Sequence, residues 1–199
     1  TNEFFMEEDT FDAEESDTEV SSTFTDEFSY DLRIPEERVG VLIGVQGKVK
    51  ADIEKNTKSK LEISKDGDVI ITGEDALLLF VAKEIARAIG RGFNPHSAML
   101  LLKSDYILEI IDMKAVAGKN KNVMERLKGR VIGTGGKARE EVERLTDTYI
   151  SVYGKTIGII GEVGQAMLAR EAMAMLLSGS MHKTVYQFLE KKKKEILFG

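Results

Sequence analysis

The chain has 199 residues and no cysteine, which excludes disulfides and thiol nucleophiles. Its net charge of −6 hides a division, because residues 1–31 hold 12 of the 34 acidic residues and no lysine or arginine, leaving +6 for the remainder. The longest apolar run, Ala76 to Ala82, is too short to cross a bilayer, and the acidic N-terminal part lacks the apolar core of a secretory signal. We therefore expect a soluble, cytoplasmic protein whose basic body suits a polyanionic partner.

Residues 1–27 are predicted to be an acidic disordered tail, rich in serine and threonine. Such a tail either solubilises the protein, folds over a basic groove in competition with nucleic acid, or docks on a partner. Residues 28–93 are predicted to form a first domain in the order strand, helix, helix, strand, strand, helix. Its predicted elements are strand 28–34, helix 35–43, helix 48–57, strands 60–64 and 69–72 joined by an Asp-Gly turn, and helix 74–89.

Residues 94–104 are predicted to be a linker with a short helix at 96–103, and residues 105–179 to repeat the same order of elements. The predicted elements of this second domain are strand 106–111, a loop at 114–122, helices up to 132 and at 138–146, strands 149–153 and 156–160, and helix 163–177. A last helix at 181–196, within residues 180–199, has no counterpart in the first domain. Its apolar stripe of Val185, Phe188 and Leu189 is expected to dock on the body.

The two domains are copies of one sequence pattern. Residues 42–50 match residues 131–139 at a constant offset of 89, and residues 71–74 match 159–162 at an offset of 88, which indicates a duplicated module. Each copy has a Gly-x-x-Gly turn between its first two helices, at 44–47 and 133–136, preceded by isoleucine and followed by lysine. Glycines and the exposed N–H groups at a helix start let a phosphate approach the backbone.

These residues resemble the KH domain, twice over. The signature is the apolar-Ile-Gly-x-x-Gly-basic turn, followed by an apolar residue six positions after the last glycine, here Ile53 and Val142. The layout of two copies, a short linker, an acidic extension and a helical C-terminus is similar to the archaeal small-subunit ribosome assembly factors known as partner of the Nob endonuclease. The resemblance implies an α+β fold of two type I KH domains, each a three-stranded antiparallel sheet covered on one face by three helices, plus a C-terminal helix.

The resemblance implies that the second copy clamps the backbone of about four nucleotides of single-stranded RNA, with bases in an apolar cleft read by main-chain groups of strand 149–153. Ile132, Val142, Ile150 and Val152 are the cleft candidates and are also plain core candidates. The predicted RNA-binding residues are Lys128, Arg130, Ile132, Gly133, Thr134, Gly135, Gly136, Lys137, Arg139, Ile150 and Val152.

The first copy is a less persuasive RNA reader, because Val45 offers neither a hydrogen bond nor the close approach that glycine allows. Weaker RNA binding, support for the second copy and protein docking all stay open. The resemblance favours docking of the alpha subunit of translation initiation factor two, or of the ribosomal RNA endonuclease. The residues concerned are Ile43, Gly44, Val45, Gln46, Gly47, Lys48 and Lys50.

Catalysis is not expected. Val131 stands where a nucleotide-binding P-loop needs glycine, and Ala138 has no oxygen for magnesium. The acids Glu140, Glu141 and Glu143 are assigned to an exposed helical face, and no catalytic residue, metal site or cofactor is predicted. The resemblance implies processing of the 3′ end of small-subunit ribosomal RNA. The alternatives are a KH-type messenger-RNA regulator, a subunit of an RNA-decay complex, and a protein scaffold that binds no RNA.

Overall fold

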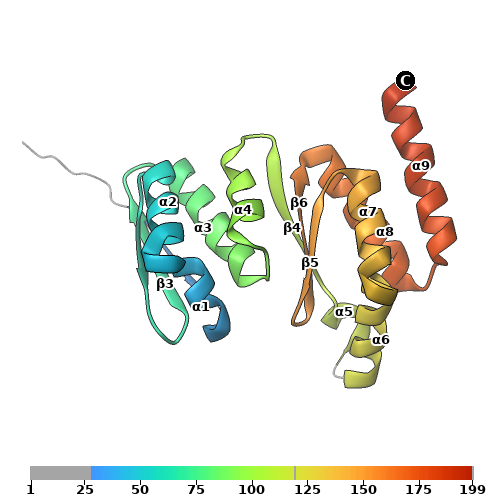
Figure 1. Cartoon of the computed structure of the whole chain (residues 1–199), viewed down its shortest axis with the longest axis horizontal. Coiled ribbons are helices and arrows are strands. Elements are labelled where there is room, and N and C mark those ends of the chain that lie inside the picture. Colours follow the sequence, from blue (N-terminus) through green and yellow to red (C-terminus); the bar gives the residue numbers. More distant parts are fainter. Residues whose placement is uncertain (1–27, 119, 199) are drawn as a thin grey trace, which may run out of the picture.

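The computed structural model describes residues 28–118 and 120–198, so the predicted acidic tail lies outside the described residues. Figure 1 shows the elements as a row of layers in which a first sheet, its helices, a linker, a second sheet, its helices and a final helix follow one another. The two sheets have the same antiparallel order, β1–β3–β2 and β4–β6–β5. The predicted α+β architecture of two such units is therefore confirmed.

The first unit follows the predicted order of elements closely. Its elements are β1 (Phe28–Arg33), α1 (Glu36–Ile43), α2 (Lys48–Thr57), β2 (Lys60–Ile63), β3 (Asp68–Gly73) and α3 (Ala76–Gly90). Helix α3 begins after Asp75, whose side chain accepts hydrogen bonds from the N–H groups of Leu77 and Leu78. The buried side chains of Ile53, Leu61 and Ile71 lie between the helices and one face of the sheet.

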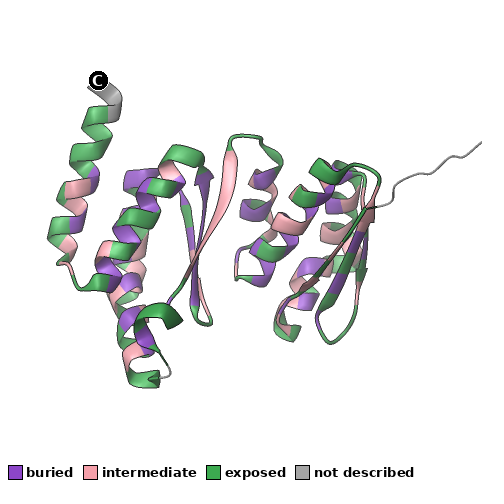
Figure 2. Ribbon diagram, turned by 180° about the vertical axis from the view of Figure 1, so that it is seen from behind, coloured by how far each residue is buried: buried purple, intermediate pink, exposed green. Residues whose placement is uncertain are grey.

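The linker forms α4 (Pro95–Ala98), which continues as a 3-10 turn over Met99–Leu102. The second unit then contains β4 (Tyr106–Asp112), α5 (Lys114–Ala117), α6 (Lys121–Ile132), α7 (Lys137–Thr146), β5 (Tyr149–Tyr153), β6 (Thr156–Glu162) and α8 (Val163–Ser178). Helix α9 (His182–Phe198) packs on the body through buried Val185 and Leu189, as predicted. Figure 2 shows that much of the remaining surface of α9 is exposed.

The predicted loop over residues 114–122 is partly wrong. Lys114–Ala117 form the short helix α5, and α6 already begins at Lys121. The reason is Asn120, whose side-chain oxygen accepts hydrogen bonds from the N–H groups of Asn122 and Val123 at 3.0 and 3.2 Å. An asparagine cap of this kind starts a helix earlier than the apolar periodicity indicates.

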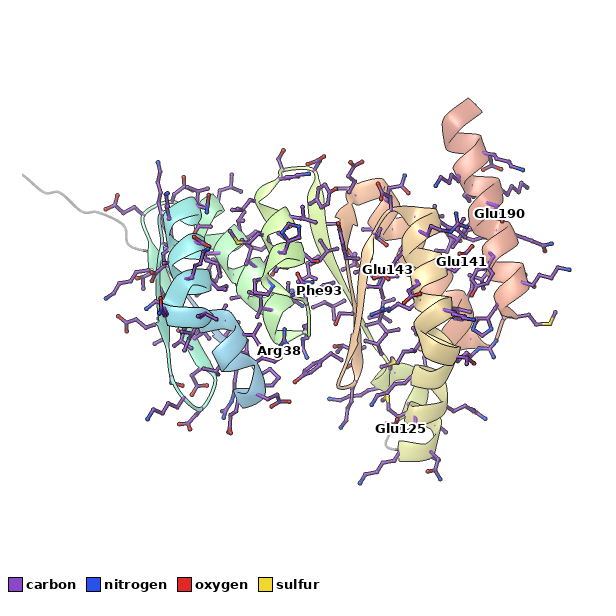
Figure 3. The ribbon with its side chains drawn as sticks, in the orientation of Figure 1. Arg38, Phe93, Glu125, Glu141, Glu143 and Glu190 are labelled. Atoms are coloured by element: carbon purple, nitrogen blue, oxygen red, sulfur yellow. The ribbon has the colours of Figure 1, made fainter. Side chains whose placement is uncertain are left out.

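The second sheet is covered on both faces. One face packs against α6–α8, while the other meets the first unit and the linker, where Phe93 is buried and its ring fills the space above Gly158. Two side chains of β5 cross the junction: the Ser151 hydroxyl donates to the Arg91 carbonyl at 2.9 Å, and the Tyr153 hydroxyl donates to Glu37 at 2.5 Å. The Tyr153 hydrogen bond lowers the pKa of Glu37. Figure 3 shows Phe93 between the two units.

Candidate nucleic-acid interface

The turn between α6 and α7 is held by glycines in the left-handed region. Gly133, Gly135 and Gly136 have φ values of +72°, +61° and +84°. Within the turn the Gly136 N–H donates to the Gly133 carbonyl and the Lys137 N–H to the Thr134 carbonyl. Thr134 and Gly135 are exposed at the tip of the turn, where a phosphate oxygen can approach their backbone N–H groups.

Gly133 and Gly135 differ in the space that a side chain would have at each position. A Cβ on Gly133 would lie 2.6 Å from the Cβ of Ala138, so this position also needs glycine for packing. A Cβ on Gly135 would meet no atom within 4 Å. That side of the turn is therefore open, and packing does not require a glycine at position 135.

The predicted cations differ in their exposure and in their ion pairs with carboxylates. Lys137 is exposed and no ion pair involves it among the described residues. Arg139 is half-buried, and its guanidinium lies 3.8 Å from Glu140 and 3.7 Å from Glu143. Lys128 forms an ion pair with Glu125 at 2.9 Å. Lys137 is thus the cation at the turn with no carboxylate competing for it.

The structure gives Arg130 a different place from the predicted one. Its Nε donates to the Leu176 carbonyl at 2.7 Å and its Nη2 to the Ser180 carbonyl, while the Arg130 carbonyl contacts the His182 ring nitrogen at 2.8 Å. The side chain therefore joins α6 to the end of α8 and the start of α9. The run of cations in the sequence indicates phosphate binding, but two of the five guanidinium N–H groups of Arg130 donate to main-chain oxygens of the fold.

Strand β5, from which the predicted base contacts come, is the edge strand of its sheet. The Ile150 and Val142 side chains are buried in the core, and Val152 packs against it, so these apolar side chains serve the fold. Ile132 is half-buried and immediately precedes the turn. Because the Ile150 N–H points outward to Glu143, the Val152 N–H two residues on also faces outward, where a base edge can meet it.

Glu143 was assigned to an exposed face, and this is wrong. Its carboxylate accepts a hydrogen bond from the Ile150 N–H at 2.6 Å, and burial raises the pKa of Glu143. The first copy repeats the contact, since Glu54 accepts from the Leu61 N–H at 2.8 Å. Glu54 and Glu143 are equivalent positions at the offset of 89. An acid repeated at the same place in both copies is the sequence signal that could have indicated their shared structural role. Figure 3 shows Glu143 on α7.

The first turn has the same backbone but a different surface. Gly44 and Gly47 have φ values of +75° and +76°, and Gln46 takes the position of Gly135 with φ +53°. Val45 is 83% exposed, so the tip of the turn is apolar. Ile43 is half-buried, Lys48 is exposed, and Lys50 lies 3.8 Å from Glu54. The first turn therefore presents apolar Val45 and polar Gln46 where the second presents Thr134 and the bare backbone of Gly135.

Within residues 28–118 and 120–198, no group of three or more histidine, cysteine or acidic side chains is placed to hold a metal ion. The helices described there also include none with the length and hydropathy needed to span a membrane.

The fold and the two turns define a tandem KH-domain protein of the nucleic-acid-binding class. Comparison with family models agrees: residues 29–90 match the KH domain, and residues 107–194 match the eukaryotic type KH-domain, a type I KH domain. A KH domain-containing protein of Methanocaldococcus jannaschii is 48% identical over 169 residues, covering 83% of this chain and 74% of that protein. The RNA-binding protein pno1 of Dictyostelium discoideum is 30% identical, covering 69% of this chain and 57% of that protein.

A solved structure is also similar. The Dim2p chain in a crystal structure of an a/eIF2alpha–aDim2p–rRNA complex from Pyrococcus horikoshii is 39% identical, with a TM-score of 0.79, and the match covers 87% of this chain and 97% of that one. The chain belongs to the family of tandem KH-domain proteins that includes PNO1 and Dim2p. The relatives are named as RNA-binding and pre-rRNA-processing proteins, and this family membership confirms the prediction that the chain is not an enzyme.

Proposed function

We propose that the chain binds single-stranded RNA through the turn at residues 133–136, and that its ligand is the 3′ end of small-subunit ribosomal RNA during ribosome assembly. The observation that carries this proposal is the open side of Gly135, between exposed Thr134 and exposed Lys137, which forms no ion pair within the described residues. The ribosomal part is supported by the similar Dim2p chain, whose structure contains rRNA. A cytoplasmic site of action belongs to the proposal, in keeping with the archaeal relatives.

The proposed RNA site is narrower than the predicted residue set. Main-chain groups of residues 133–136 hold phosphate, Lys137 and Arg139 add positive charge, Lys128 contributes from the preceding helix, and the Val152 main chain meets a base edge. Ile132 borders the cleft. Ile150 acts through the fold, and Arg130 is left out of the proposed set because its Nε and Nη2 donate to the Leu176 and Ser180 carbonyls.

For the first copy we propose a docking surface for a protein. Exposed Val45 gives the tip of its turn the apolar contact that a protein interface uses, while Lys48 and Lys50 border it. The occupant is the alpha subunit of translation initiation factor two, which is present in the Pyrococcus complex, or the ribosomal RNA endonuclease. We also propose the predicted domain limits: 28–93 and 105–179 for the KH domains, with residues 94–104 between them and 180–199 after them.

A matched pair of double variants tests this division. Thr134→Asp with Gly135→Asp should abolish binding of a fluorescent single strand carrying the 3′ end of small-subunit rRNA, because two carboxylates then face the phosphates. Val45→Asp with Gln46→Asp should leave RNA binding nearly unchanged and weaken capture of the initiation-factor subunit. Equal loss of RNA affinity in both variants would overturn the division between the copies.

Selection from random single strands tests the ribosomal part separately. Winners that map to the 3′ end of small-subunit rRNA support it. Winners that map to messenger RNA would remove the ribosomal role and keep RNA binding, whereas the absence of any enriched strand would favour the scaffold alternative.

A further inference from the structure

A second basic site lies at the far end of α6 from the turn. A cleft of about 680 Å³ is enclosed by α5, the first turns of α6 and the hairpin between β5 and β6. Four lysines line it, namely Lys114, Lys121, Lys128 and Lys155. Figure 1 shows α5 beside the lower end of β5, with α6 next to it.

The charge in this cleft is poorly compensated. Glu125 is the acid among the lining residues, and it pairs with Lys128 at 2.9 Å. Asp112, two residues before Lys114, accepts from the backbone N–H of Lys114 and keeps its negative charge, so even with Asp112 counted two acids stand against four lysines. Lys114, Lys121 and Lys155 are exposed, and none of them forms an ion pair within the described part of the chain. Positive charges gathered in a concave site attract a polyanion.

The cleft belongs to the second copy alone. In the first copy β1 ends at Arg33 and α1 begins at Glu36, so no helix separates them. In the second copy α5 lies between β4 and α6, and α6 has 12 residues against 8 in α1. The Met113 N–H donates to the Lys155 carbonyl at 3.0 Å, which fixes α5 against the hairpin. The residues added to the second copy thus build one wall of the cleft.

One face of α6 leads from this cleft to the turn. Lys121, Lys128 and Ile132 are spaced so that they share a helix face, and Ile132 directly precedes Gly133. The path along the helix is about 18 Å at 1.5 Å per residue. Lys128, halfway along, lines the cleft and was already predicted to contact RNA.

We propose that this cleft is a second phosphate-binding site for the same RNA strand, which it holds beyond the roughly four nucleotides clamped by a KH turn. The inference rests on the proposed RNA binding at residues 133–136 and extends it. The ligand is the phosphodiester backbone, because lysines supply charge without reading a base. The second copy therefore binds a longer strand than a minimal KH domain does.

Strand length separates the two sites experimentally. Fluorescence anisotropy with a four-nucleotide and a ten-nucleotide RNA, over a series of salt concentrations, compares the wild type with the triple variant K114Q/K121Q/K155Q. The triple variant should bind the four-nucleotide RNA like the wild type and bind the ten-nucleotide RNA about tenfold more weakly. Loss of three phosphate contacts should reduce the salt slope on the longer strand by about 2.

The control removes the same charge elsewhere. Lys183, Lys193 and Lys194 on α9 are exposed and far from the cleft lysines along the chain, so K183Q/K193Q/K194Q should keep the preference for the longer strand. Thermal unfolding midpoints verify that each variant is folded. If the two triple variants lose equal affinity, the effect is one of net charge and the cleft proposal is wrong.

A gain of affinity provides a second test. Glu125→Gln removes the acid that competes for Lys128, so the ten-nucleotide RNA should bind severalfold more tightly. Unchanged or weaker binding would contradict the proposal. Failure of RNA binding at the turn itself would give a different result. In that case the wild type would not bind the four-nucleotide RNA, or the Thr134→Asp/Gly135→Asp variant would bind it as tightly as the wild type does.

Discussion

The carboxylate of Glu143 on α7 accepts a hydrogen bond from the backbone N–H of Ile150, at the start of the edge strand β5, over 2.6 Å. The guanidinium of Arg139 lies 3.7 Å from the same carboxylate. Glu143 thus connects α7, the helix that follows the turn, to the edge strand β5. The first copy keeps the arrangement, with Lys50, Glu54 and the Leu61 N–H in the corresponding places.

Truncating Glu143 should destabilise the second domain. Glu143→Ala leaves the Ile150 N–H without its acceptor, which costs about 1–3 kcal/mol in the free energy of unfolding. Urea denaturation measures this loss. Glu140→Ala is the control, because Glu140 is exposed and the change should stay within about 0.5 kcal/mol. A loss at Glu140 as large as that at Glu143 would contradict the structural role.

The same residue predicts a pH dependence. Burial raises the pKa of Glu143, while the Ile150 N–H and Arg139 act in the opposite direction. The folded state therefore binds the proton more readily than the unfolded state, so this group's contribution to stability falls as pH rises from its ordinary pKa of 4.5. Glu143→Gln keeps an oxygen acceptor and does not ionise. The wild type should lose stability relative to this variant with rising pH, and a pH-independent difference would refute the assignment.

Two alanine substitutions in the turn should separate folding from binding. Gly133→Ala combines a left-handed φ with a 2.6 Å contact to Ala138 and should cost about 2–4 kcal/mol in the free energy of unfolding. Gly135→Ala meets open space and should cost about 1 kcal/mol. It should nevertheless weaken RNA binding, because its methyl group projects toward the strand. Denaturation and anisotropy check both effects, and full RNA affinity in a folded Gly135→Ala variant would be evidence against backbone contact there.

Arg130 and Lys137 should respond in opposite ways to substitution by alanine. Arg130→Ala removes hydrogen bonds to the Leu176 and Ser180 carbonyls and should cost about 1.5–3 kcal/mol of stability. RNA affinity of the folded variant should stay close to that of the wild type. Lys137→Ala should change stability by less than about 0.5 kcal/mol and lower the salt slope of RNA binding by about 0.7. Loss of RNA affinity without loss of stability in Arg130→Ala would restore Arg130 to the RNA site.

Phe93 should hold the two units together. Its ring is buried against the second sheet near Gly158, so Phe93→Ala should cost about 3–5 kcal/mol. The variant should also have a larger radius of gyration in small-angle scattering, because the junction loses the aromatic ring that packs on Gly158. Leu77→Ala is the control, since Leu77 is 73% exposed. An unchanged unfolding midpoint in Phe93→Ala would mean that the junction contributes little to stability.

The amino-acid sequence by itself determined the order of the elements, the duplication and the position of the two turns. These features rest on local signals: apolar periodicity defines helices and strands, glycine marks the left-handed turns, and a constant offset relates the copies. They allowed α2 and β5 to be placed at their observed bounds. The start of α6 at Lys121 was not predicted, because an asparagine cap is a weaker sequence signal than apolar periodicity.

Only the tertiary structure decided which charged residues are free to bind. Arg130 and Lys137 look alike in the sequence, but Arg130 meets carbonyls 46 and 50 residues away, whereas Lys137 faces solvent. Glu143 is similarly fixed by a strand N–H, and the cleft lysines come from three separate elements. Partners of this kind are set by long-range packing, and no local pattern specifies them. The physical reason is that hydrogen bonds and ion pairs made within the fold compete with a ligand for the same side chain, and their partners lie far away in the sequence.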